Sequence, residues 1–227
     1  MNIAIIPARG GSKRIPRKNI KLFHGKPMIA WSILAAKQAG CFDRIIVSTD
    51  DAEIAAVAQE YGAEVPFIRP AEIANDYATT GDVISHAISW LIEQGQSPEQ
   101  VCCLYATAPF VEPDDLRQGL ALLTGNSECQ FAFSAARFGF PIQRAIKLDD
   151  DGRVSMFSPE HLLTRSQDLE EAYHDAGQFY WGRSSAWLNK ASIFAAHSHV
   201  VLLPSYRVQD IDTPDDWLRA ERLFALR

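Results

Sequence analysis

Short, uniformly apolar runs alternate with segments of helical periodicity over the first half of the chain. Residues 3–6, 44–48 and 101–105 are such runs, and each has the length of a strand that is buried on both faces. Residues 64–68 are a further strand candidate. Because helical segments separate these strands, the pattern predicts an α/β domain of three layers around a mainly parallel, Rossmann-like sheet.

The helical segments have recognisable beginnings and ends. Pro27 precedes the first helix and Gly40 follows it, which are the positions that proline and glycine usually take around a helix. Gly62 stops the second helix, and Thr80 can cap the third, which ends at Gly95. The predicted helices cover residues 28–39, 52–61, 80–94 and 113–123.

The pattern changes between residues 131 and 182, where aromatic residues are mixed with charges and no helical period is visible. We expect an inserted antiparallel lobe there, which covers the active site, packs on another subunit, or does both. A strand from residue 200 to about Asp212 and a last helix from Pro214 then return to the main domain. Because no low-complexity linker separates these parts, residues 1–227 are expected to form a single domain.

Composition and charge exclude several classes of protein. The net charge is −6 and no block of consecutive Lys or Arg occurs, which argues against a general nucleic-acid binder. No apolar run is long enough for a membrane span or a signal peptide, so we expect a cytoplasmic protein without a membrane partner. The four cysteines show no CxxC spacing, which makes structural zinc improbable.

A glycine-rich basic segment follows the first predicted strand, at the edge where open α/β sheets bind their ligands. Paired glycines let backbone N–H groups approach phosphate oxygens, and Arg9, Lys13 and Lys18 can neutralise their charge. A nucleoside triphosphate site is therefore one interpretation, and a solvated surface turn is the other, because a lone Gly-Gly is weak evidence. The segment consists of Ala8, Arg9, Gly10, Gly11, Ser12 and Lys13.

Two familiar phosphate-binding patterns do not occur in the sequence. It has neither the GxxxxGK[ST] motif of P-loop ATPases nor the GxGxxG motif of dinucleotide enzymes, and the second absence disfavours a dehydrogenase.

A second candidate site lies near the C-terminus. On a strand, residues two apart point to the same face, so Asp210 and Asp212 are expected to converge. Two carboxylates at a strand end suit Mg²⁺ that arrives with a nucleotide. Thr213, Pro214 and Asp216 are explained as the start of the last helix, and we assign function to Asp210 and Asp212 alone.

The string IPARGGSKRIPRKN, residues 6–19, resembles the signature of the CMP-sialic acid synthetases, or acylneuraminate cytidylyltransferases. The related enzymes for the eight-carbon sugar Kdo share a looser form of it. The resemblance extends over essentially the whole chain. It implies a fold of the nucleotide-diphospho-sugar transferase type, a lobe that makes a homodimer, and condensation of CTP with an acidic nine-carbon sugar to a CMP-sugar and pyrophosphate.

The resemblance also implies roles for individual residues in nucleotide binding. Arg9 and Lys13 would face the phosphates and, with Asp212, form the catalytic group. Mg²⁺ would be the cofactor, held by Asp210 and Asp212. Two simpler interpretations stay open: Arg69 as a surface ion pair and Thr80 as a helix cap alone. The implied CTP-binding residues are Ala8, Arg9, Gly10, Gly11, Ser12, Lys13, Lys18, Asn19, Arg69, Ala78 and Thr80.

Other positions bear on which sugar is used. Tyr105 stands where sialic acid synthetases commonly have a glutamine that meets the sugar, which counts against N-acetylneuraminic acid. Residues 138–145 and 173–182 resemble the pseudaminic acid cytidylyltransferase subgroup, whose product would serve surface glycans or flagellin. Arg144 and Arg165 would pair with the sugar carboxylate. Packing in the lobe or a dimer interface is the other explanation for the aromatic residues. The implied sugar-binding residues are Tyr105, Arg144, Arg165, Tyr173, Gln178 and Phe179.

Rival functions remain at this stage. The same reaction could use legionaminic, N-acetylneuraminic or a Kdo-type sugar. From a different class, the chain could be a CTP-binding regulatory or scaffold protein that has the fold without the chemistry. The mechanism that we expect for the enzyme is direct displacement at the α-phosphate, since positioning and charge neutralisation are what such transfers need.

Overall fold

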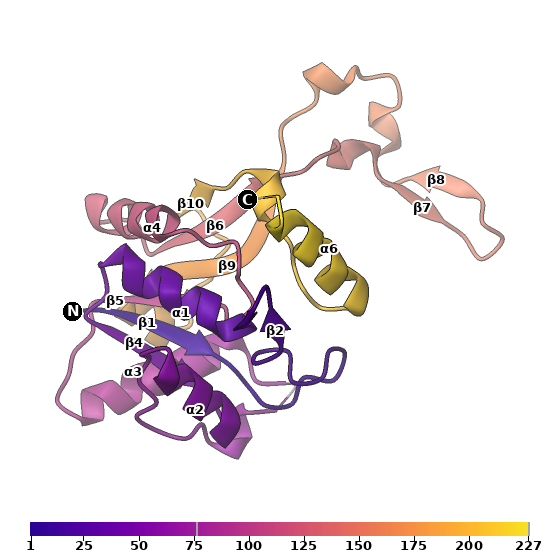
Figure 1. Ribbon diagram of the computed structural model, residues 1–227. Coiled ribbons are helices and arrows are strands. Elements are labelled where there is room, and N and C mark those ends of the chain that lie inside the picture. The colour runs from indigo at the N-terminus through magenta and orange to yellow at the C-terminus, as the bar shows by residue number, and fades with distance from the viewer. Residues whose placement is uncertain (76, 227) are drawn as a thin grey trace.

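The computed structural model describes residues 1–75 and 77–226. Its centre is a sheet of six strands in the order β10-β6-β9-β5-β1-β4 (Figure 1). Strand β1 pairs in parallel with β4 and β5, and β6 pairs in parallel with β10. Strand β9 runs antiparallel to both of its neighbours, β5 and β6. The predicted mainly parallel α/β sheet is therefore confirmed. The six strands are β1 Asn2–Pro7, β4 Arg44–Ser48, β5 Gln100–Leu104, β6 Phe131–Arg137, β9 Tyr173–Arg183 and β10 Ser198–Leu202.

Helices cover both faces of this sheet, which explains why its strands are apolar throughout. Alternate residues of β1 face opposite layers: Ile6 packs with α1, α2 and α4, whereas Ile3 and Ile5 pack with α3 and α5. Figure 1 shows the resulting three layers. No helix among the described residues is long and apolar enough to cross a membrane. The helices are α1 Met28–Ala39, α2 Ala52–Glu60, α3 Thr80–Glu93, α4 Pro113–Gly125, α5 Ser184–Leu188 and α6 Pro214–Phe224.

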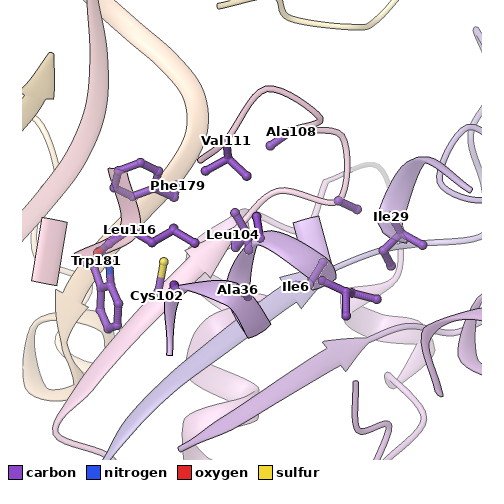
Figure 2. Close-up of a cluster of buried hydrophobic side chains, with 14 of the residues drawn as sticks. Ile6, Ile29, Ala36, Cys102, Leu104, Ala108, Val111, Leu116, Phe179 and Trp181 are labelled. Atoms are coloured by element: carbon purple, nitrogen blue, oxygen red, sulfur yellow. Dashed lines mark hydrogen bonds between the residues drawn. The ribbon is translucent and has the colours of Figure 1, made fainter. Parts of the chain in front are cut away.

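The core between the sheet and α4 contains Trp181, the largest of the fully buried side chains, together with Phe179 (Figure 2). Trp181 is completely buried, and its indole N–H donates to the carbonyl of Leu116 over 2.9 Å. Gly119 allows α4 to lie close to the sheet, because a Cβ there would come within 2.6 Å of Trp181 and 2.8 Å of Phe179. Phe179 therefore belongs to this core.

Two local predictions differ from the structure. Residues 64–68 do not form a strand; Glu64 and Ile68 each make one isolated bridge, because Pro66 between them cannot donate a backbone hydrogen bond. The cap of α3 is Thr79, whose hydroxyl accepts from the backbone of Asp82 over 3.1 Å. Thr80 is thus the first residue of the helix, and its side chain is not used as a cap.

The lobe expected over residues 131–182 is shorter than predicted. Strands β6 and β9, at its two ends, pair with each other inside the main sheet. Residues 138–172 leave the sheet between them, and we call this segment the arm (Figure 1). It carries the small hairpin β7 Ile146–Leu148 and β8 Val154–Met156. A second hairpin, β2 Leu22–Phe23 and β3 Lys26–Pro27, follows the glycine-rich segment.

Candidate functional site

A cavity of about 530 Å³ opens at the carboxyl ends of β1 and β5, where parallel α/β sheets bind ligands. Segments far apart in the sequence meet there: the loop after β1, the loop before α3, the residues after β5, and Asp212. The cavity therefore brings most of the predicted nucleotide site together. The predicted site residues that line it are Arg9, Ser12, Lys13, Lys18, Asn19, Arg69, Ala78, Thr80, Tyr105 and Asp212.

The charge of this cavity is predominantly positive. Among the described residues that line it, Asp212 is the acidic one, and the basic ones come from two segments of the chain, the stretch after β1 and the loop before α3. Clustered cations in a cleft attract and hold a polyanion. The basic residues are Arg9, Lys13, Arg14, Lys18 and Arg69.

Hydrogen bonds fix the glycine-rich loop to the end of β4. The backbone N–H of Ala8 donates to the carbonyl of Ser48 over 2.9 Å, which extends the β1–β4 pairing and buries Ala8 beneath the cavity. The amide of Gly10 donates to a carboxylate oxygen of Asp50 over 2.9 Å. The buried side-chain amide of Asn19 donates to the carbonyl of Arg9 over 3.0 Å. The loop is thus held before any ligand binds.

The two glycines of this loop are required for different reasons. A Cβ on Gly10 would lie 2.7 Å from Oδ2 of Asp51. Asp51 cannot move easily, because it caps α2 and forms a two-point ion pair with Arg17 that lowers the pKa of its carboxyl group. A Cβ on Gly11 would meet no described atom within 4 Å. Packing therefore explains Gly10, whereas packing does not explain Gly11, for which the expected approach of a ligand to the backbone stays a prediction.

Arg69 is buried, with 5% of its surface exposed, so it is not a surface ion pair. Its Nε donates to the hydroxyl of Ser48 over 3.1 Å and its Nη2 donates to the carbonyl of the same residue. Burial lowers the pKa of the guanidinium, and the nearby Arg9 lowers it further, while Asp50 opposes both. A bound anion would offset this crowding of positive charge.

Asp212 connects the C-terminal segment to the glycine-rich loop. Its two carboxylate oxygens bind Nζ of Lys18 at 3.1 Å and Nη2 of Arg14 at 2.8 Å. Lys18 also donates to the carbonyl of Ile211 over 2.6 Å. The side chain of Ile211 is completely buried, with Phe23 among its neighbours. These contacts place Asp212 at the cavity wall.

The prediction of a strand that runs through Asp212 is wrong. Strand β10 ends at Leu202, and Asp210 and Asp212 lie in an irregular segment, so the argument from strand alternation does not apply. Partial desolvation and, next, the charge of Asp212 raise the pKa of Asp210, so the two carboxylates affect each other electrostatically. Asp210 is exposed and is not among the described residues that line the cavity.

The predicted sugar-binding residues do not come together in one chain. Tyr105 lines the cavity, and its hydroxyl lies 3.4 Å from that of Thr80. The prediction that Phe179 binds the sugar is wrong, because its side chain is completely buried against α4 and cannot contact a ligand in the cavity. Gln178 is buried as well, and its amide donates to the carbonyl of Arg207 over 2.6 Å. It therefore supports the C-terminal segment.

The remaining three candidates lie on the arm or at its base. Arg144 donates to the carbonyl of Thr164, and Arg165 pairs with Asp168 at 2.7 Å. The hydroxyl of Tyr173 donates to Glu171 over 2.8 Å. All three side chains are exposed and none is among the described residues that line the cavity.

Sequence reasoning missed several residues of the cavity. Arg14 belongs to the basic segment, but the sequence predicted no role for it. Its contact with Asp212 joins residues far apart in the chain, which no sequence spacing indicates. Asn75 shapes one wall, because its side-chain oxygen accepts from the backbone N–H groups of Tyr77 and Ala78. An asparagine in a loop before a helix is a usual sign of such a turn. Other lining residues not predicted are Pro7, Ile15, Ile73, Val83, Ala106 and Thr107.

The chain is similar to known proteins over almost its whole length. A family model described as cytidylyltransferase matches residues 3–209. The pseudaminic acid cytidylyltransferase of Campylobacter jejuni is 49% identical, over 98% of this chain and 96% of that protein. The CMP-N,N'-diacetyllegionaminic acid synthase of Legionella pneumophila is 35% identical, over 99% of this chain and 96% of that protein.

Solved structures support the same fold. A CMP:2-keto-3-deoxy-manno-octonic acid synthetase complexed with CTP superposes with a TM-score of 0.71. The comparison covers 99% of this chain and 98% of that one, at 18% sequence identity, so it bears on the fold alone.

The different environments of the two loop glycines lead to a prediction. Gly10→Ala should lower the free energy of unfolding by about 1–3 kcal/mol, because the new methyl group collides with a side chain that cannot move. Gly11→Ala should change it by less than about 0.5 kcal/mol, yet weaken CTP binding about tenfold by keeping phosphate oxygens from the backbone. Urea unfolding and titration calorimetry measure these two quantities. A Gly10→Ala protein as stable as wild type, or a Gly11→Ala protein that binds CTP normally, would contradict the assignment.

Proposed function

Because this chain belongs to the cytidylyltransferase family, we propose that it condenses CTP with pseudaminic acid, a nine-carbon acidic sugar, to give the CMP-sugar and pyrophosphate. The observation that carries the proposal is the cationic cavity at the carboxyl ends of β1 and β5, which suits a triphosphate. The choice of sugar is supported by the 49% identity with a pseudaminic acid cytidylyltransferase along 98% of the chain. We place this reaction in the cytoplasm.

The nucleotide would lie across the cavity with its charged end toward the glycine-rich loop. Arg9 and Lys13 would contact the phosphates, and the buried Arg69 would add positive charge from below. The cytosine would lie beside Ala78 and Thr80, at the wall before α3. Hydrogen bonds to the base edge in a buried site would reject uracil, since its pairing groups would be left unsatisfied.

Asp210 and Asp212 have the chemistry of a magnesium site. Partial desolvation and, next, the charge of Asp212 raise the pKa of Asp210, and a bound cation would favour the ionised form of both carboxylates. The described residues contain no cluster of three or more metal-binding side chains, so phosphate oxygens and water would complete the coordination of Mg²⁺. When bound, the ion would polarise the α-phosphate.

The protein's own contribution would be positioning and charge neutralisation. The anomeric hydroxyl oxygen of the sugar forms a bond to the α-phosphorus, the bond from that phosphorus to the bridging oxygen breaks, and the hydroxyl proton is released. Pyrophosphate leaves with the electron pair of the broken bond. Arg9 and Lys13 would stabilise the negative charge that develops on it. Lys18 and Arg14 would keep Asp212 at the cavity wall.

We further propose a homodimer in which the arm of each subunit closes the cavity of its partner. Apolar side chains are strongly exposed along the arm: Phe140 is 86% exposed and Leu163 is 92% exposed. Side chains of this kind are usual where a protein surface becomes buried by a partner. Arg144 and Arg165 lie outside the cavity of their own chain, and in a dimer they would meet the sugar carboxylate in the other subunit.

The metal assignment can be tested with Asp212→Asn. Wild-type protein should release pyrophosphate from CTP and pseudaminic acid only when Mg²⁺ is present. The variant should lose about 100-fold or more in rate, because a neutral amide is a poor ligand for a hard divalent cation. It should also bind Mn²⁺ more weakly in the presence of CTP, as followed by electron paramagnetic resonance. Asp215→Asn, an exposed acid in the next helix, serves as the control. Near-normal, magnesium-dependent turnover by Asp212→Asn would show that the assignment is wrong.

The proposed exchange of arms makes a separate prediction. A variant with Arg144→Ala and Arg165→Ala and a second variant with Asp212→Asn should each be inactive alone. After denaturation and refolding together, about a quarter of wild-type activity should return, because half of the dimers are mixed and each has one intact site. If the arm acts within its own chain, or if the protein is a monomer in sedimentation experiments, mixing restores nothing.

A further inference from the structure

The side chain of Arg207, shortly before the two acidic residues of the C-terminal segment, is clamped to the start of α4. Its guanidinium donates to both carboxylate oxygens of Asp115, over 2.6 and 3.0 Å, and pairs with Glu112 at 3.2 Å. The side chain of Arg207 is 11% exposed and that of Asp115 is 5% exposed. Asp115 is fixed in turn by the capping box of α4, since it accepts from the backbone N–H of Glu112. A two-point pair on such a rigid partner fixes the orientation of the guanidinium.

The backbone of Arg207 is held as well. Its carbonyl accepts from the side-chain amide of Gln178, a buried residue of β9, over 2.6 Å. Its N–H donates to the carbonyl of Pro204 over 2.9 Å. The next residue, Val208, packs against the core between the sheet and α4. The chain is therefore attached at Arg207 through both its side chain and its main chain, and Arg207 has no part in the reaction described above.

Asp210 lies between this clamp and a second attachment at Ile211. Three steps along the chain separate Asp210 from Arg207, which limits their Cα atoms to about 11 Å apart. Ile211 is completely buried, and its carbonyl accepts from Lys18 over 2.6 Å. Asp212 is held through its own carboxylate, by ion pairs that include the one with Lys18. The placement of Asp210 depends instead on the backbone on either side of it.

We propose that Arg207 is a positioning residue, which holds Asp210 where its carboxylate can bind Mg²⁺ together with Asp212. This inference rests on the proposed function. Residues that orient the ligands of a metal ion, without touching the ion, commonly set its affinity. Without the clamp, the chain before Ile211 would lose its fixed conformation, and binding of the ion would cost the entropy of ordering it again. Asp212 would keep its own ion pairs.

The test measures how much Mn²⁺ strengthens the binding of CTP, by titration calorimetry of the whole protein without sugar. The quantity compared is the ratio of the dissociation constants for CTP in EDTA and in Mn²⁺. Mn²⁺ affects free CTP equally in every experiment, so the ratios of different variants can be compared. Arg207→Met should lower the ratio about tenfold. It should change the dissociation constant in EDTA by less than about twofold, which a general loss of structure would not spare.

Two further variants serve as graded and matched controls. Arg207→Lys keeps the charge but not the two-point pair, so it should lower the ratio about threefold. Arg44→Met removes an arginine of similar burial, whose side chain is 18% exposed and which pairs with Glu64. Arg44 begins β4, at the end of the sheet away from the cavity, and its loss should leave the ratio unchanged.

A double variant shows whether Arg207 acts through Asp210. Asp210→Asn alone should lower the ratio about tenfold, because it removes a metal ligand. Adding Arg207→Met to it should lower the ratio by no more than about a further twofold, since the group that Arg207 places is already gone. Losses that multiply to about 100-fold, or a normal ratio in Arg207→Met, would overturn the inference.

The remaining outcomes are also decisive. If Arg207→Met does not fold, Arg207→Lys takes its place in the same cycle, and a ratio equal to that of the wild type overturns the inference. Failure of the proposed function appears in the wild type itself, which would then gain no affinity for CTP from Mn²⁺ beyond that of Asp210→Asn, or would turn over none of the sugars. Failure of the inference alone leaves the wild type normal.

Discussion

The salt bridges of Asp212 with Lys18 and Arg14 are the interaction on which the cavity depends, because they join the two ends of the chain. The glycine-rich loop is held by β4 on one side, through Asp50 and Asp51, and by these pairs on the other. The bond from Lys18 to the carbonyl of Ile211 adds a second point of attachment. The Lys18–Asp212 pair is partly buried and is costly to break from one side, since the remaining charge loses its partner. The Arg14–Asp212 pair contributes less, because the side chain of Arg14 is largely exposed.

A small apolar cluster supports this junction from below. Phe23, which follows the loop, packs edge to face against Trp217 of α6, with ring centroids 5.4 Å apart. Ile211 is buried in the same cluster. The helix start at Thr213 and Asp216 was predictable from sequence, and it fixes the segment just after Asp212. The local signals that start α6 and the long-range ion pairs with Lys18 and Arg14 thus position the same carboxylate, that of Asp212.

The sequence predicted the fold and family well because both depend on strong local patterns. Runs such as residues 3–6 are apolar throughout since helices cover both faces of the sheet, and the match of a cytidylyltransferase model to residues 3–209 confirms the family. Composition could not separate a buried antiparallel strand from the exposed arm, so the lobe was predicted too wide. Alternation along β9 was the missed signal: Phe179 faces α4, whereas Tyr180, one residue on, faces Tyr105. The pairing of Asp212 with Arg14 is a tertiary contact that no spacing indicates.

The proposed activity has a general part, transfer from CTP, and a specific part, the identity of the sugar. Mass analysis of the products formed from CTP with pseudaminic, legionaminic and N-acetylneuraminic acids, each at the same concentration, tests both at once. We predict CMP-pseudaminic acid and an equal amount of pyrophosphate, formed much faster than either other CMP-sugar. Intact CTP after incubation with all three sugars and Mg²⁺ would contradict the account.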